Sequence, residues 1–290
     1  MAAQGIPENR YSLIKQIAAT RRKPYMTRRE FLDYHYQVHG AIADSPEDPS
    51  LKPHKYYQQH VFDSAFGARP NGPLNANHHW TGRDDVTELW FKDLDHMLGN
   101  FRSEWVQKTV GPDGANFADL EMSINLMALE KPLPLSVGLK EADVVVDDAA
   151  GKHAITAMYW VALPGEEKNG AEAEKTLTPL LRNALEKSAS DEVYKWLVNV
   201  GLTLEGFDPS AYFGGADLPK YALVYKIYMK DANSAMAVRN AQKAFEDEAG
   251  PVSVDIRASF IIFNKEVLVM DVAEGFRFDK TRQPVFKDTL

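Results

Sequence analysis

Residues 88–97 read ELWFKDLDHM, and a related pattern returns at residues 225–236 as YKIYMKDANSAM. In each copy an aromatic, strand-like run leads into a Lys-Asp pair, and a helix is expected to follow. Lys92-Asp93 recurs 138 residues later as Lys230-Asp231. Aspartate is a favourable N-cap, because its carboxylate accepts a hydrogen bond from the first helical turn. A repeat of this length indicates two copies of one structural unit.

The residues around the first copy predict the order strand, helix, strand, strand, helix, strand. Strands are expected at 10–19, 54–62, 85–91 and 120–130, and the second helix at 93–107. The first helix begins at a capping box, TRRE at 27–30, and is expected to end near Ala43, before Pro46. The Gly-, Pro- and Asn-rich loop at 66–84 is long enough to serve as a functional lid.

The second copy has the same order, with strands expected at 153–163 and 193–206 and a helix at 172–188. This is the βαββαβ order of the ferredoxin-like split βαβ motif. We predict an α+β fold in which two such units pack sheet against sheet, enclose a barrel and carry their helices outside. The predicted domains are 1–132 and 153–290, joined by a connector at 133–152.

Composition excludes several classes of function. The 290-residue chain has a net charge of −8, and its only dense basic run is RRKPYMTRR at 21–29, so no nucleic-acid partner is expected. Cysteine is absent, which excludes disulfides, thiolate metal sites and a cysteine nucleophile. No signal peptide or membrane-length apolar run is visible, so we expect a cytoplasmic protein with no membrane partner.

The first copy resembles the EthD-domain family. The matching segments are RREFLDYHYQVHGAIAD (28–44), KYYQQHVFD (55–63), DDVTELWF (84–91) and NFADLE (116–121), within residues 10–132. The resemblance implies a dimeric α+β barrel, here formed within one chain, and a small-molecule pocket. Fungal relatives include polyketide-tailoring proteins, among them small decarboxylases. The second copy lacks these segments and is interpreted as a diverged, structural half.

Seven of the eight histidines lie between residues 35 and 96, which favours one working half. His35 and His39 both fall on the apolar stripe of the first helix. A neutral imidazole in a pocket can move a proton near pH 7. Because His39 also lies in a segment that resembles the EthD-domain family, the resemblance makes it the first catalytic candidate. The alternative is a core histidine bonded to a backbone carbonyl, which suits His35 better. The i, i+4 spacing could also chelate zinc, but no suitable carboxylate accompanies it, so no metal is predicted.

Two strands supply the other candidates. His60 lies in a polar strand expected to be covered on both sides, so it needs a partner or a wet lumen, and it is the second catalytic candidate. Glu88 is the third, because desolvation would raise its pKa into the range of a general acid. Its alternative role is a salt bridge to Arg83 or another cation. The residues assigned to substrate binding are His35, Tyr57, Gln58, His79, Trp80 and Trp90.

These residues lead to three functional hypotheses. The first is a cofactor-free lyase, either a decarboxylase or a dehydratase/cyclase, that uses histidine acid–base chemistry in the barrel cavity. Its substrate would be a hydrophobic, oxygenated small molecule such as an aromatic polyketide acid. The second is a cofactor-independent monooxygenase, because related barrels oxidise aromatic anthrones. The third is a non-enzymatic ligand-binding barrel. No phosphate-binding or nucleophile-elbow motif occurs and no cofactor is predicted, while assembly as a homodimer is left open.

Overall fold

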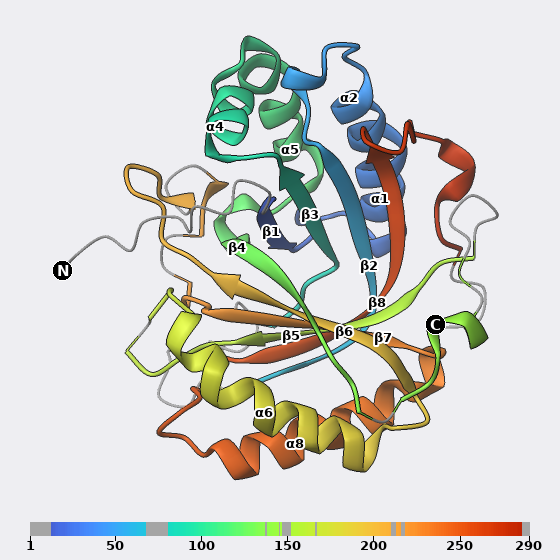
Figure 1. Ribbon diagram of the computed structural model, residues 1–290. Coiled ribbons are helices and arrows are strands. Elements are labelled where there is room, and N and C mark those ends of the chain that lie inside the picture. Colours follow the sequence, from blue (N-terminus) through green and yellow to red (C-terminus); the bar gives the residue numbers. More distant parts are fainter. Residues whose placement is uncertain are drawn as a thin grey trace.

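The computed structural model describes residues 13–67, 81–136, 138–144, 146, 152–165, 167–209, 213–215 and 218–285. Its strands form a closed antiparallel barrel in the order β1-β3-β2-β8-β5-β7-β6-β4 (Figure 1). The first copy supplies β1 (Ile14–Thr20), β2 (Lys55–Phe66), β3 (Asp85–Phe91) and β4 (Ile124–Leu133). The second supplies β5 (Ile155–Val161), β6 (Val193–Gly201), β7 (Leu223–Met229) and β8 (Phe260–Asp271).

Each copy has the strand order of a ferredoxin-like unit. Within the barrel the strands of the first copy lie in the order β4-β1-β3-β2, and those of the second lie in the order β8-β5-β7-β6. When the strands of each copy are numbered from one to four along the chain, both orders are 4-1-3-2. The pairs β2–β8 and β4–β6 join the two sheets and close the barrel. The predicted fold class is therefore confirmed.

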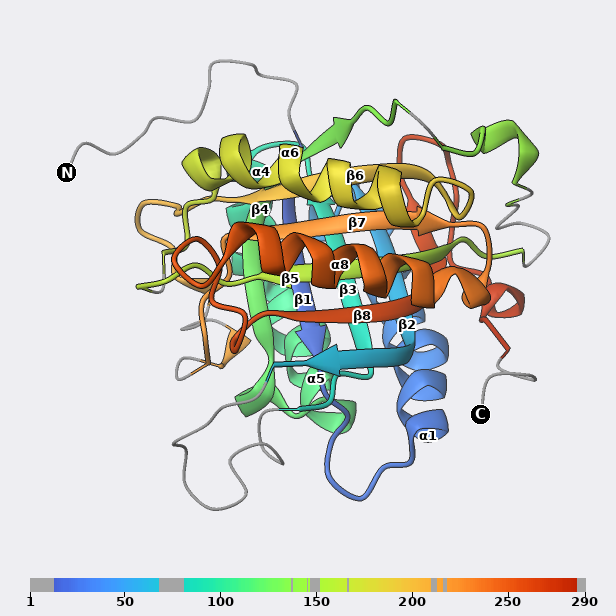
Figure 2. The same cartoon turned by 90° about the horizontal axis from the view of Figure 1, so that it is seen from below.

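The helices cover opposite sides of the barrel (Figure 1). One side carries α1 (Arg28–Asp33), the π-helix η1 (Tyr34–Gly40), α2 (Ala41–Asp44), α4 (Leu94–Arg102), the π-helix η3 (Val106–Val110) and α5 (Gly111–Phe117). The other carries α6 (Ala171–Ser188) and α8 (Ala235–Ala249), which lie side by side in Figure 2. Short 3-10 turns occur at Pro49–Leu51 (η2), Leu120–Met122 (η4), Glu141–Asp143 (η5), Ala232–Ser234 (η7) and Lys280–Arg282 (η8).

The caps read from the sequence are present. Thr27 and Glu30 form the reciprocal capping box of α1. Asp93 accepts a hydrogen bond from the His96 backbone N–H, and Asp231 accepts one from Asn233. The two aspartates have nearly the same backbone angles, φ −163° and ψ −178° against φ −160° and ψ −176°. This shared turn confirms the repeat at the level of single residues.

Several predicted boundaries differ from the structure. The helix predicted at 93–107 ends at Arg102, because Ser103 is extended, and a new helical run follows up to Phe117. The strand predicted from residue 120 begins at Ile124, after the 3-10 turn η4. The strand predicted at 193–206 ends at Gly201.

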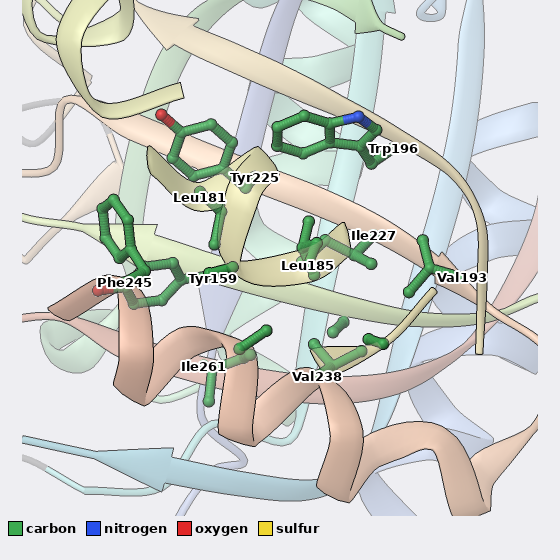
Figure 3. Packing of buried hydrophobic residues seen from close by; sticks show 14 of the residues in the cluster. Tyr159, Leu181, Leu185, Val193, Trp196, Tyr225, Ile227, Val238, Phe245 and Ile261 are labelled. Carbon is green, nitrogen blue, oxygen red and sulfur yellow. The ribbon is translucent and has the colours of Figure 1, made fainter. Parts of the chain in front are cut away.

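A hydrophobic core fills the space between the second sheet and its helices. Leu181 and Leu185 of α6 and Val238 and Phe245 of α8 pack onto this face (Figure 3). The sheet contributes the large side chains Tyr159, Trp196 and Tyr225. Because these rings occupy the volume beneath α6 and α8, the two helices pack directly against each other.

The barrel interior contains an apolar layer and an ionic layer. The apolar layer includes Ile17, Val86, Leu126, Met158, Trp160, Val224, Phe260 and Ile262. In the ionic layer Glu88 pairs with Lys15 Nζ at 2.6 Å and with Lys226 Nζ at 2.5 Å. Lys226 also pairs with Glu266, and Gln59 Nε2 donates to both carboxylates at 2.6 Å. Glu88 and Lys226 occupy equivalent positions of the two copies, 138 residues apart.

Substituting Lys226 tests how strongly this layer stabilises the barrel. Lys226→Met keeps most of the side-chain volume but leaves Glu88 and Glu266 buried without their shared cation. We expect the free energy of unfolding to fall by roughly 3–5 kcal/mol, measured by urea denaturation. The control is Lys131→Met, which breaks an exposed pair with Glu174 and should cost about 1 kcal/mol or less. Equal, small losses in both variants would contradict a stabilising role for the ionic layer.

Candidate functional site

A cavity of about 410 Å³ lies between the first sheet and the helices that cover it. His35 and His39 line it from η1, and Tyr56 and Thr87 line it from the sheet. Its apolar lining includes Ala43, Leu51, Pro53, Leu89, Phe101, Val106, Val110, Phe117, Leu120 and Phe213, and its other polar lining residues are Gln16, Thr20, Asn100, Gln107, Ser123 and Asn125. The prediction of a site in the barrel cavity is therefore wrong about location, because the histidines face the opposite side of the sheet from the barrel interior.

The second copy has no room for the same cavity because its equivalent positions carry larger or apolar side chains. Strand register pairs Ala18 with Thr87 in the first copy and Tyr159 with Tyr225 in the second. The next strand differs in the same way. In the first copy β2 places Tyr56, Gln58 and His60 beside β3. The equivalent positions of β6, beside β7, hold Trp196, Val198 and Val200. The second set belongs to, or packs against, the core under α6 and α8. This supports the interpretation of one working half and one structural half.

The two histidines lie in the π-helical segment η1. A π-helix forms i→i+5 hydrogen bonds, and such segments are rare and often found at functional sites. The ring centroids of His35 and His39 are 5.5 Å apart. Phe117 of α5 stacks on His35 with a centroid separation of 4.6 Å and contacts His39 at 4.9 Å. One aromatic ring therefore holds both imidazoles at the cavity wall.

His39 is oriented by Asp113 of α5. Its Nδ1 lies 2.9 Å from Asp113 Oδ2, and Tyr34 and Asn116 donate to the other carboxylate oxygen at 2.8 and 3.0 Å. These hydrogen bonds, with that of His39 first, lower the pKa of Asp113 to about 2. An ionised Asp113 accepts the Nδ1–H, so His39 presents the lone pair of Nε2. Burial lowers the pKa of His39, which keeps the ring neutral at pH 7 and able to act as a base.

His35 lies deeper, between a carboxylate and a phenol. Its Nδ1 is 3.3 Å from Asp85 Oδ1, and its Nε2 is 3.1 Å from the hydroxyl of Tyr56. Gln58 Nε2 donates to the same hydroxyl at 2.7 Å and to the His35 carbonyl at 3.0 Å. Burial lowers the pKa of His35 to about 3, so this imidazole is also neutral at pH 7.

His60 does not line the cavity. It is fully buried, its Nε2 lies 3.1 Å from Gln58 Oε1, and burial lowers its pKa to about 4. Gln58 is likewise buried and acts on the site through Tyr56 and the His35 carbonyl. Neither side chain lines the cavity, so neither is placed to touch a ligand there. Their hydrogen bonds instead help to position the residues that form the cavity wall.

The structure contradicts the role predicted for Glu88. Burial by itself would raise its pKa, but Lys15 and Lys226 outweigh burial and lower it to about 2, so it is no general acid. It sits in the barrel interior, as do Tyr57 and Trp90, which pack against each other at 5.8 Å and neighbour the buried lysines. The alternative of a salt bridge is correct, although the partners are lysines and not Arg83. His79 and Trp80 lie outside the described residues.

Two amide side chains leave polar atoms unpaired at the cavity wall. Gln16 Oε1 and Asn100 Nδ2 are buried and find no hydrogen-bond partner among the described residues. Gln16 and Asn100 are 2% and 3% exposed, and both line the cavity. A buried amide without a partner is costly, so the cavity wall offers one acceptor and one donor to whatever occupies the cavity, water included.

Residues 277–279 anchor the helix that carries His35 and His39, which consists of η1 and α2 and is called the histidine helix below. Asp44, at the end of α2, accepts hydrogen bonds from Arg277 Nε at 2.9 Å and from the Phe278 N–H at 2.7 Å. The Tyr36 hydroxyl donates to the Asp279 carbonyl at 2.9 Å. At Gly40 a Cβ would meet Val269 at 3.3 Å, so glycine allows this helix to lie close to β8. The second copy therefore helps to set the position of η1, and among the described residues it also contributes Phe213 to the cavity lining.

No group of three or more His, Asp or Glu side chains among the described residues is arranged to hold a metal ion. His35 and His39 instead each turn Nδ1 toward a carboxylate. None of the helices in the described ranges combines the length and apolar character needed to cross a bilayer.

Comparison with known proteins places the first copy in a family. Residues 23–121 match the EthD domain. The N-terminal copy is an EthD domain. The matched range includes all four segments that carried the resemblance, at 28–44, 55–63, 84–91 and 116–121. It also includes His35, His39, Asp85 and Asp113. No curated protein sequence matches the chain significantly.

Solved structures similar to the EthD-containing chain extend over both copies. An anthrone oxidase-like protein aligns with a TM-score of 0.50 and 10% identity, covering 91% of this chain and 96% of its own. Chlorite dismutase from Candidatus Nitrospira defluvii in complex with imidazole aligns with a TM-score of 0.43 and 9% identity, covering 91% and 94%. At these identities the likeness concerns the fold alone.

The sequence alone missed the partners of the histidines. Asp85 is the second residue of the segment DDVTELWF and Phe117 lies in NFADLE, so the family segments contained both without revealing their contacts. Tyr56 lies within the segment KYYQQHVFD, and it was given no role from the sequence. Asp113 follows Gly111-Pro112 in a helix that was not predicted, and nothing in the local pattern marks it as the partner of His39.

The His39–Asp113 pair predicts a change in proton affinity. Asp113→Asn removes a negative charge that favours the protonated ring, so the pKa of His39, already lowered by burial, should fall further. The measurement is a ¹⁵N-detected NMR titration of the histidine rings. Asp119→Asn, which breaks a pair with Arg21, is the control and should leave the His39 titration unchanged. A higher His39 pKa in Asp113→Asn would contradict this arrangement.

Proposed function

We propose that this protein is a cofactor-free lyase that removes water from a neutral, hydrophobic ketone, with His39 as the base. The carrying observation is the His39–Asp113 pair, which presents a neutral Nε2 to a mainly apolar cavity. A volume of about 410 Å³ suits a ligand of a few fused rings. The amide and hydroxyl groups among the apolar side chains suit an oxygenated ring system.

The chemistry follows from the positions of the two histidines. His39 Nε2 takes a proton from the carbon next to the ketone, and charge moves onto the ketone oxygen as an enolate forms. Tyr56, whose pKa is raised by burial, stays protonated and can donate to that oxygen. The enolate then expels the β-hydroxyl group, which leaves as water with the proton from His39, and a carbon–carbon double bond remains.

The lining favours an uncharged substrate. No Lys, Arg, Asp or Glu lines the described part of the cavity. A carboxylate bound there would be desolvated without a paired cation, which is costly. Dehydration or dehydrative cyclisation of a neutral polyketide-like ketone therefore has more support than decarboxylation of the corresponding acid.

Oxygenation is a competing outcome. One structural neighbour is named anthrone oxidase-like, and an anthrone is a neutral tricyclic ketone that would suit this lining. Proton removal by His39 would be shared by both reactions, because an anthrone must lose a proton before it reacts with oxygen. The two reactions differ in their products: dehydration releases water and consumes no oxygen.

The experiment combines genetics with the purified protein. Metabolites that accumulate in a deletion strain of the source organism are extracted and incubated with the protein, and products are followed by accurate mass. A product lighter by one water supports the proposal. A product lighter by one CO₂ would replace it with decarboxylation, and a product heavier by oxygen with oxygen uptake would replace it with oxygenation. No product at all would remove the enzymatic role.

Replacing His39 tests its role in turnover. His39→Gln keeps a polar side chain but removes the base, so the rate should fall about 10²–10⁴-fold with little change in folding. The control is His96→Gln, because His96 lies at the start of α4 and does not line the cavity. Turnover that is equal in His39→Gln and the wild type would assign the proton transfer to another group.

A further inference from the structure

Behind the cavity wall lies a buried acid that the proposed function does not use. Asp85 is fully buried at the start of β3. Neither of its carboxylate oxygens accepts a hydrogen bond of good geometry from the described residues. Its carboxylate oxygens lie 3.3 Å from His35 Nδ1 and 3.9 Å from His60 Nε2. A buried carboxylate with so little compensation is costly when ionised.

We propose that Asp85, His35 and Tyr56 form a proton relay that ends at the cavity, and that its hydrogen bonds reverse direction when Asp85 gains or loses a proton. The three side chains form a line from the buried carboxylate to the cavity wall. His35 bridges them, with Nδ1 toward Asp85 and Nε2 toward the Tyr56 hydroxyl. The relay exists whether or not the proposed dehydration occurs, but its use in turnover rests on that proposed function.

With Asp85 ionised, the donors point inward. The carboxylate then accepts the His35 Nδ1–H, because it has no proton to donate. His35 therefore carries a lone pair on Nε2, and the Tyr56 hydroxyl donates to it across 3.1 Å. The phenolic proton is occupied within the protein and is not available to a ligand.

With Asp85 protonated, the donors point outward. Its O–H donates to His35 Nδ1, so His35 carries its proton on Nε2 and donates to the Tyr56 oxygen. That oxygen also accepts from Gln58 Nε2 at 2.7 Å, which occupies both of its lone pairs. The Tyr56 proton must then turn away from His35, toward Thr87 and the cavity, where it can be donated to a ketone oxygen.

One turnover of the relay conserves protons. Tyr56 gives its proton to the substrate oxygen and receives the Nε2 proton of His35, while Asp85 gives its own proton to His35 Nδ1. At this stage the relay is in the inward arrangement, with Asp85 ionised and the substrate present as an enol. When the enol expels the β-hydroxyl group and the carbonyl forms again, its oxygen returns the proton to Tyr56 and the transfers run backward, so Asp85 is protonated again. No oxidant, reductant or metal is needed.

The charged and titratable groups around Asp85 set when it protonates. Burial is the largest influence and raises its pKa to about 7. The charged or titratable groups near it are His60 of β2, Asp84 just before it in the chain, Glu88 on the opposite face of β3, and His35 and His39 of η1. The carboxylates oppose ionisation of Asp85 and the nearby imidazoles favour it. Because Asp85 can be protonated or ionised near neutral pH, the reversal of the hydrogen bonds can be observed directly.

NMR of the histidine rings tests the relay without a substrate. In wild-type protein labelled with ¹⁵N, His35 should stay neutral from pH 5.5 to 8.5 and change from the Nε2–H tautomer to the Nδ1–H tautomer with a midpoint near pH 7. The loss of its signals in His35→Gln assigns them. Asp85→Asn should abolish the pH dependence of the tautomer. Asp113→Asn is the matched control and should alter His39 while leaving the His35 switch in place.

The outcomes separate the relay from the proposed function. A single His35 tautomer over the whole range in the wild type, or an unchanged switch in Asp85→Asn, would overturn the relay. The wild-type titration decides the question even if the variant does not fold. Loss of turnover in His39→Gln together with a fixed His35 tautomer would retain the lyase and reject the relay. A pH-dependent His35 tautomer together with full turnover in His39→Gln would retain the relay and reject His39 as the base of the proposed lyase.

Stability gives a second, independent measurement. The pKa of Asp85 is about 7 in the folded protein against an ordinary value of 3.8, so the stability it contributes is full below pH 3.8 and is lost as pH rises through 7. Asp85→Asn cannot ionise, so it should gain stability relative to the wild type between pH 5 and pH 8. Urea unfolding at these two pH values measures the change. A difference that is the same at both would show that Asp85 does not take up a proton in this range.

Discussion

The ion pair between Glu88 and Lys226 fixes which face of each sheet points into the barrel. These residues occupy the same position in the two copies, and they meet across the interior together with Lys15 and Glu266. Side chains alternate along a strand, so once Glu88 faces inward, Asp85 and Thr87 must face the helices. A shift of one residue would bury the pocket residues in the barrel and expose the charges to the helices. The ionic layer therefore holds the register on which the cavity depends.

The two copies use one architecture for two purposes. In the second copy the sheet face under the helices carries Tyr159, Trp196 and Tyr225, and these rings bring α6 and α8 together over a filled core. In the first copy smaller or polar side chains at the equivalent positions leave a cavity between the sheet and the helices. The second copy still acts on the site, because the Arg277–Asp44 contact and the close packing at Gly40 hold the histidine helix in place.

The candidate site separates two proton-carrying groups by their surroundings. His39 keeps an ionised partner, Asp113, because three hydrogen bonds stabilise that carboxylate. His35 faces Asp85, whose carboxylate lacks such bonds and holds its proton to about neutral pH. The same residue pair, aspartate with histidine, thus gives a fixed base in one place and a reversible donor in the other. The difference lies in the number of donors around each carboxylate and not in the residue types.

The sequence by itself determined the elements and their order. The Lys-Asp repeat and the TRRE capping box are local features, and they were enough to predict two ferredoxin-like units. The choice of His39 as a candidate depended on the resemblance to the EthD-domain segments. The sequence did not determine which partner each charge would meet. For Glu88 it left open a desolvated general acid or a salt bridge to Arg83 or another cation, and it did not point to Lys226, which lies 138 residues away. Asp113 and Asp85 reach the histidines only through tertiary packing. The π-helical turn and the side of the sheet that holds the cavity were likewise decided by the tertiary structure, because both depend on side-chain volumes contributed by distant segments.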